Sequence, residues 1–162
     1  ECDEQSAELW LRRSEETTLA SSPARERAQL HARSRLLIQQ SRFTQALSSY
    51  LPLRESILQD PVVKRRITDL STLAYAAAVC GLETVALESF AEVVPVLDRE
   101  QPTQLLDYPA EMSVRTLLAL GRPEEAQALG NEYLTRRTRY HDRPLTKFCE
   151  ELGRRQAAKT LT

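Results

Sequence analysis

Three similar bends recur along the chain every 40 residues, and this repeat constrains the fold more than any other feature. The segments are SRFTQALSSY from Ser41, GLETVALESF from Gly81 and GRPEEAQALG from Gly121. Each bend separates two stretches in which apolar residues recur at helical spacing. A repeat of this length is typical of stacked helical hairpins, because a single hairpin cannot bury its apolar face alone.

The composition favours an all-α fold. The 162 residues include only 4 glycines, and 41% of the residues are hydrophobic while 28% are charged. Ala, Leu, Glu, Arg and Gln, which all favour helices, dominate the chain. We expect one domain of about 7–8 helices with no sheet, since a chain of this length buries one substantial core.

Proline and turn residues predict where these helices begin and end. The expected helices cover residues 3–19, 23–40, 44–58, 62–80, 84–99, 105–120, 124–137 and 145–159. They divide the chain into an N-terminal helix within 1–22, hairpin repeats at 23–60, 61–101 and 102–139, and a C-terminal capping helix within 140–162. Pro52 and Pro95 fall inside second helices of hairpins, and we expect a kink or break at each.

Alanine occupies the same column after every bend, as Ala46, Ala86 and Ala126. Two antiparallel helices joined by a short bend approach closely only where a small residue follows the bend, while a larger residue of the partner packs over it. We therefore expect these three alanines to be buried where paired helices touch.

The bends resemble those of tetratricopeptide-repeat proteins. The pattern of a small residue, an aromatic two positions later, then alanine and a second aromatic is seen in SRFTQALSSY and partly in GLETVALESF, and LLALGRPEEA is similar to it. The resemblance spans about residues 25–137 and implies a right-handed solenoid of antiparallel helical hairpins. The chain departs from the family in its longer period, since about 34 residues is usual. It also departs in the aromatic after the bend, which is present at Phe43 but replaced by Glu83 and Pro123.

In this family the first helix of each hairpin lines the concave face, so the resemblance implies a groove that binds another protein or peptide. Arg35, Tyr75 and Arg115 fall in equivalent columns of the three repeats. Two cations about an aromatic ring suit a ligand with acidic groups and an apolar anchor. The groove residues implied by the resemblance are His31, Arg35, Gln39, Ser71, Tyr75, Tyr108, Glu111, Arg115, Glu151 and Arg155.

The sequence favours a non-catalytic scaffold or adaptor module over an enzyme. It contains no glycine-rich phosphate loop, no G-x-S-x-G elbow and no H-E-x-x-H motif. Cys2, Cys80 and Cys149 are widely spaced, which fits neither a disulfide framework nor a zinc site, and we expect no cofactor or metal. The alternative is a ligand- or oligopeptide-sensing domain of a bacterial signalling or transcription regulator. A DNA-binding or enzyme domain in the full-length chain would favour that alternative.

The charge distribution favours a protein partner. The net charge of −1 predicts no nucleic-acid partner, and no run approaches the roughly 18 apolar residues of a membrane span. A cytoplasmic location is favoured, with an exported or periplasmic chain as the alternative because residue 1 is Glu rather than Met. Two basic runs, RRTRYHDR from Arg136 and KRR from Lys64, could hold phosphate or an acidic partner. Solvated helix ends are the favoured interpretation of both runs.

Overall fold

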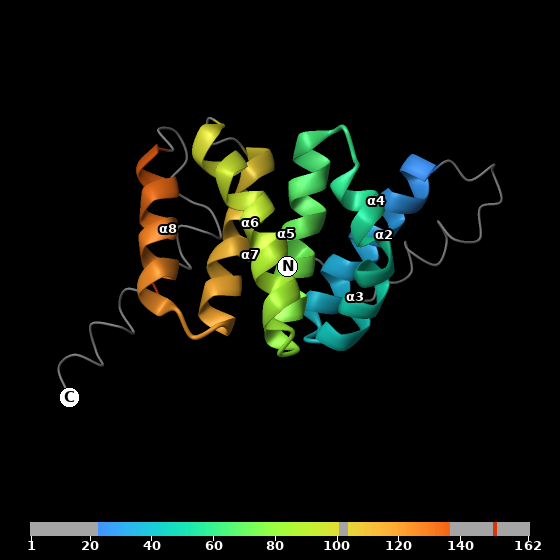
Figure 1. Cartoon of the computed structure of the whole chain (residues 1–162), viewed down its shortest axis with the longest axis horizontal. Helices are drawn as coiled ribbons and strands as arrows, with labels where there is room; N and C mark the ends of the chain where they lie inside the picture. Colours follow the sequence, from blue (N-terminus) through green and yellow to red (C-terminus); the bar gives the residue numbers. More distant parts are fainter. Residues whose placement is uncertain (1–22, 101–103, 137–150, 152–162) are drawn as a thin grey trace.

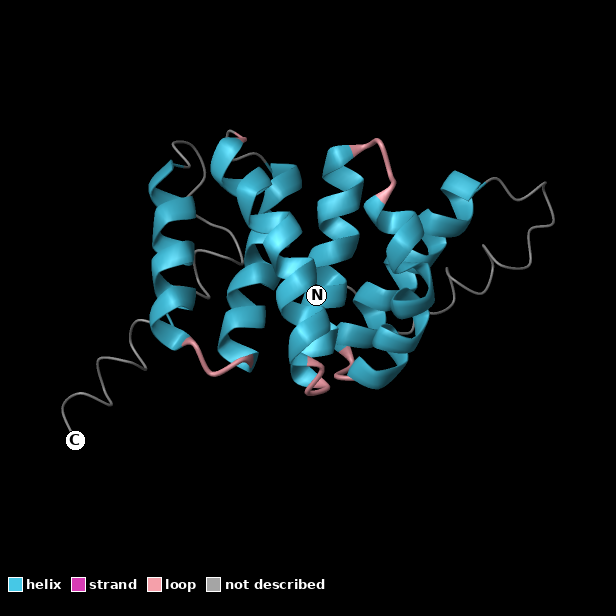
Figure 2. Ribbon diagram, in the orientation of Figure 1, coloured by secondary structure: helices cyan, strands magenta, loops and turns pink. Residues whose placement is uncertain are grey.

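The computed structural model describes residues 23–100 and 104–136, together with Glu151. These residues form an all-α structure of six packed helices, the second of which is broken (Figure 2). In chain order the elements are α2 (Pro23–Gln39), α3 (Phe43–Tyr50), the 3-10 helix η1 (Leu51–Leu53), α4 (Arg54–Leu58), α5 (Val63–Val79), α6 (Glu83–Arg99), α7 (Gln104–Ala119) and α8 (Pro123–Arg136). The expected all-α class is confirmed. The helices expected at 3–19 and 145–159 lie outside the described residues, apart from Glu151.

The three bends share one backbone geometry. Ser41, Gly81 and Gly121 all have positive φ angles, of 59°, 77° and 72°. The amide after each of them donates to the carbonyl five residues back, in the bonds Arg42 to Leu37 at 2.7 Å, Leu82 to Ala77 at 2.9 Å and Arg122 to Leu117 at 2.9 Å. The amides of the bend residues themselves donate to Ile38 at 3.0 Å, Ala78 at 3.1 Å and Leu118 at 3.0 Å. This pair of bonds is the Schellman motif, which ends a helix at a left-handed residue.

The helices stand side by side in an elongated row, with α2, α3 and α4 at one end and α8 at the other (Figure 1). α5 occupies the middle and contacts α2, α3, α6 and α7, while α7 also contacts α8. Ten of the 17 residues of α5 are buried, as expected for a helix with neighbours on most sides. Its first half places Ile67 and Leu70 in the core, each 0% exposed.

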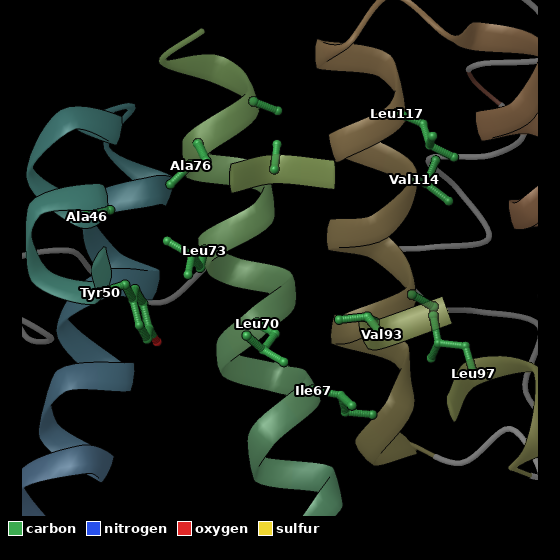
Figure 3. Packing of buried hydrophobic residues seen from close by; sticks show 14 of the residues in the cluster. Ala46, Tyr50, Ile67, Leu70, Leu73, Ala76, Val93, Leu97, Val114 and Leu117 are labelled. Carbon is green, nitrogen blue, oxygen red and sulfur yellow. The ribbon is translucent and has the colours of Figure 1, made fainter. Parts of the chain in front are cut away.

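The buried core follows the row of helices from end to end. Figure 3 shows Ala46 and Tyr50 of α3 on one side of α5, and Val93, Val114 and Leu117 on the other. Ala46, Ala86 and Ala126 are each 0% exposed, so the expected burial of the alanine after every bend is confirmed.

The two prolines behave differently. Pro52 lies in the 3-10 helix that separates α3 from α4, so the break expected there is confirmed. Of the kink or break expected at Pro95, the break is wrong, because α6 runs from Glu83 to Arg99 without interruption, and the kink stays a prediction. Pro95 and Ala91, whose carbonyl loses its helical donor to the proline ring, both lie on the exposed side of α6. Ser48 and Pro52 are exposed in the same way, so exposure of the freed carbonyl does not explain why only the helix at Pro52 breaks.

The buried alanine column generates a first test. Replacing Ala86 by Leu adds volume at a position with no exposed surface, and we expect the free energy of unfolding to fall by about 1–3 kcal/mol. Urea denaturation measures this change. Ala91→Leu on the exposed side of the same helix is the control and should stay within about 0.5 kcal/mol of wild type. Equal stability of both variants would contradict close packing at the bend.

The bend geometry generates a second test. Ser41 holds a left-handed conformation that costs a residue with a Cβ about 1–2 kcal/mol, so Ser41→Gly should stabilise the fold by up to about 1 kcal/mol after the entropy cost of glycine. Gly81→Ala should destabilise it by about 1 kcal/mol. An added Cβ at Gly81 meets no atom within 4 Å, so this cost is purely one of backbone conformation. Thermal and urea unfolding that shift both variants in the same direction would refute the assignment.

Candidate functional site

A pocket of about 460 Å³ opens between α2, α5 and α7, next to the first bend. We call it the bend-side pocket. Its walls are formed by Arg35, Ile38, Gln39, Ser41, Phe43, Tyr75, Tyr108, Glu111, Met112 and Arg115. Six of these are groove residues expected from the sequence, namely Arg35, Gln39, Tyr75, Tyr108, Glu111 and Arg115. The volume falls within the roughly 300–1,000 Å³ of small-molecule and side-chain pockets.

Arg35 bridges α2 and α7 across α5. Its guanidinium carbon lies 4.3 Å from the centroid of the Tyr108 ring, a distance at which the cation is attracted to the ring face. Among the described residues, no carboxylate forms an ion pair with Arg35. Arg35 is exposed and a cation–π contact uses no N–H donor, so Arg35 presents N–H groups to an incoming anion.

The rest of the lining combines a second cation with aromatic surface. Arg115 Nη2 lies 2.9 Å from Glu111 Oε1, and Arg115 Nε donates to the same oxygen at 3.0 Å. The rings of Phe43 and Tyr75 pack edge to face, with centroids 5.5 Å apart and an interplanar angle of 82°. The lining therefore carries two guanidinium groups against one carboxylate, and this positive excess lies beside aromatic walls.

A hydrogen bond to α5 fixes the position of the Tyr108 side chain. Its hydroxyl lies 3.2 Å from Thr72 Oγ1, and that oxygen donates its own proton to the Thr68 carbonyl at 2.8 Å. The phenol of Tyr108 must therefore donate to Thr72. Burial raises the pKa of Tyr108, which keeps this donor protonated at neutral pH. The ring that Arg35 covers thus has a defined position.

His31 lies beyond this contact and does not line the bend-side pocket. Its Nδ1 is 3.1 Å from the Tyr50 hydroxyl and 3.3 Å from Asp69 Oδ1, and its ring meets the Tyr108 ring edge-on at 5.8 Å. The Tyr50 hydroxyl donates to Asp69 Oδ1 at 3.3 Å. Burial, and then the charge of Asp69, raise the pKa of Tyr50 well above its usual range, so the phenol remains a donor to Asp69 and accepts from His31.

The remaining groove residues expected from the sequence lie elsewhere. Ser71 is 1% exposed, and its hydroxyl donates to the Thr68 carbonyl at 2.9 Å, so its side chain does not reach the pocket. Glu151 is exposed and helical but does not belong to the lining. Arg155 lies outside the described residues. The sequence prediction missed the apolar part of the lining. Only Phe43 in that part could have been identified from the sequence, because it is the aromatic residue directly after the first bend.

Other kinds of site find no support in the part of the chain that the structure describes. There, no three or more His, Cys, Asp or Glu side chains gather as a metal centre would require. None of the helices described is both long enough and apolar enough for a membrane span.

The buried group around Tyr50 generates a third test. Tyr50→Phe removes the donor to buried Asp69, and we expect the free energy of unfolding to fall by about 1–3 kcal/mol at neutral pH. Tyr75→Phe is the control and should stay within about 0.5 kcal/mol of wild type. Because the pKa of folded Tyr50 is raised, its stabilising contribution is complete below the ordinary value of 10.0 and is lost as pH rises through the raised pKa. The stability gap between wild type and Tyr50→Phe should therefore narrow at alkaline pH. A gap that widens there would be incompatible with the donor role.

Comparison of the chain with protein-family models, with curated proteins and with solved structures gives no match. The function of the bend-side pocket must therefore be argued from its own geometry.

Proposed function

We propose that the chain is a non-catalytic binding module built as a divergent tetratricopeptide-like solenoid, and that it holds another protein or peptide on the face formed by α2, α5 and α7. The observation that carries the proposal is that Arg35, Tyr75 and Arg115, spaced 40 residues apart, line one pocket. The shared Schellman geometry of the three bends and the buried alanine after each bend support the repeat architecture.

The chemistry of the bend-side pocket favours an acidic group beside an apolar anchor. Arg35 offers guanidinium donors that no described carboxylate uses, whereas Arg115 is partly neutralised by Glu111. The Phe43 and Tyr75 rings supply a surface on which an apolar side chain can pack. Charge-assisted contacts to the anion and burial of the anchor would together determine affinity and orientation.

A second candidate function is the sensing of a small ligand or oligopeptide by a regulatory domain. The observation that favours it is the volume of about 460 Å³, which suits a small molecule as well as one or two side chains. Both functions call for an acidic group beside an apolar anchor. They differ in the length of the preferred ligand, which is a protein segment or peptide in the first function and a small molecule or oligopeptide in the second.

Selection from a random peptide library displayed on phage tests the proposal. We expect selected peptides to carry Asp or Glu next to a large apolar residue. Arg35→Ala and Arg115→Ala should each weaken a selected peptide by about 1–3 kcal/mol in calorimetric titrations, since both remove a charge-assisted contact. If affinity is retained when the selected peptide is cut to two or three residues, the sensing function is favoured.

The control for these variants is an arginine remote from the pocket. Arg54 does not suit this purpose, because its Nη2 lies 2.9 Å from Glu88 Oε2 and it links α4 to α6. Arg99 is exposed in the last turn of α6 and does not line the pocket, so Arg99→Ala should leave binding unchanged. Selected peptides that bind Arg35→Ala and Arg115→Ala as tightly as wild type would place the binding surface elsewhere.

A further inference from the structure

A second pocket, of about 500 Å³, lies at the opposite end of the same three helices. We call it the helix-start pocket. It shares no lining residue with the bend-side pocket, and its walls are formed by Ala28, His31, Val62, Lys64, Arg65, Thr68, Asp69 and Leu105. His31 and Arg35 both contact Tyr108, and the contact that they make between α2 and α7 separates the two pockets.

The walls of the helix-start pocket carry the most exposed large apolar side chains of the described residues. Leu105, in the first turn of α7, is 64% exposed, and Val62, just before α5, is 48% exposed. Single exposed apolar residues are ordinary on protein surfaces, but exposed apolar residues gathered around a hollow mark a surface that another molecule covers. Covering these two side chains would bury apolar area on both sides of the pocket.

The rim of this pocket is basic at the start of α5, where helices favour acidic residues. Lys64, Arg65 and Arg66 lie in the first turn of α5, and that turn contains no acidic residue. Cations at a helix start are opposed by the helix dipole, so the interpretation of this run as a favourably charged helix end does not apply here.

One of these three charges is balanced within the fold. Arg65 Nε donates to Asp60 Oδ2 at 2.5 Å, and Arg65 Nη2 donates to Asp60 Oδ1 at 2.8 Å. Arg66 donates only to the backbone carbonyl of Asp60, and Lys64 forms no ion pair with a described residue. Asp69, the carboxylate in the lining of this pocket, is held by Tyr50 and His31. A positive excess therefore remains beside the apolar walls.

We propose that the helix-start pocket is a second docking site, and that it takes a large apolar side chain from an acidic segment of a partner protein. Val62 and Leu105 contact the apolar side chain, and Lys64 pairs with a carboxylate next to it in the partner. The contact between Arg35 and Tyr108 lies between the two pockets, which share no lining residue. A partner can therefore dock in the helix-start pocket when the bend-side pocket is empty.

Fluorescence anisotropy with the labelled peptide EEELFEEE tests this site, with QQQLFQQQ and EEESSEEE as matched probes for charge and for the apolar anchor. We expect binding of EEELFEEE to the wild-type chain, and at least about tenfold weaker binding of either matched probe. Leu105→Glu and Lys64→Glu should each weaken EEELFEEE by at least about tenfold, because the first places a charge on the apolar wall and the second reverses the rim charge.

Two controls locate the site. Leu51→Glu alters a side chain that is 40% exposed and lines neither pocket, and it should not change the affinity for EEELFEEE. Because the bend-side pocket is proposed to take a similar ligand, the same variants are also measured in an Arg115→Ala chain, in which that pocket is weakened but the Arg35–Tyr108 contact is kept. In this chain Leu105→Glu and Lys64→Glu should still weaken EEELFEEE by at least about tenfold. Unchanged melting temperatures would show that Leu105→Glu and Lys64→Glu remain folded. The proposal is overturned if the wild-type chain does not bind EEELFEEE at about 1 mM, if QQQLFQQQ binds equally well, or if Leu105→Glu binds like wild type. Loss of binding in Arg115→Ala, with Leu105→Glu binding like wild type, would assign the peptide to the bend-side pocket and refute the second site.

Discussion

The arrangement of both pockets depends on the narrow middle of α5. The residues that α5 buries there include the small Ser71, Thr72 and Ala74 beside the larger Leu70 and Leu73. Small side chains let neighbouring helices approach closely, so Arg35 of α2 reaches the ring of Tyr108 of α7 across the helix between them. Thr72 takes part directly, because its oxygen accepts the hydroxyl proton of Tyr108 and holds the ring under the guanidinium.

This contact divides one face of the helical row into two chemically different surfaces. On the side toward the bends, guanidinium groups lie next to aromatic rings, which suits an anion attached to a flat apolar group. On the side toward the helix starts, Val62 and Leu105 form apolar walls beside the basic first turn of α5. A partner that engaged both surfaces would gain avidity, since the second contact would form at a high effective concentration.

Much of the fold could be predicted from the sequence because its determinants are local. Helical periodicity placed the described helices to within one or two residues, except where the second helix breaks at Pro52. The recurring bend residues predicted the helix stops, since a left-handed residue ends a helix whatever surrounds it. Pro95 was the exception. A proline removes one helical hydrogen bond wherever it falls, so its presence alone did not separate Pro95, where α6 continues, from Pro52, where the helix breaks.

The sequence by itself determined the all-α class, the positions of the three bends and the first-helix columns that hold Arg35, Tyr75 and Arg115. Each of these follows from backbone conformation or from spacing along one helix. Only the tertiary structure decided which of those residues meet. It paired His31 with Asp69 of another helix, buried Ser71, and placed Phe43 in the wall of the bend-side pocket. The physical reason is that contacts between helices depend on the rotation and separation of whole helices, which are set by close packing of the entire core.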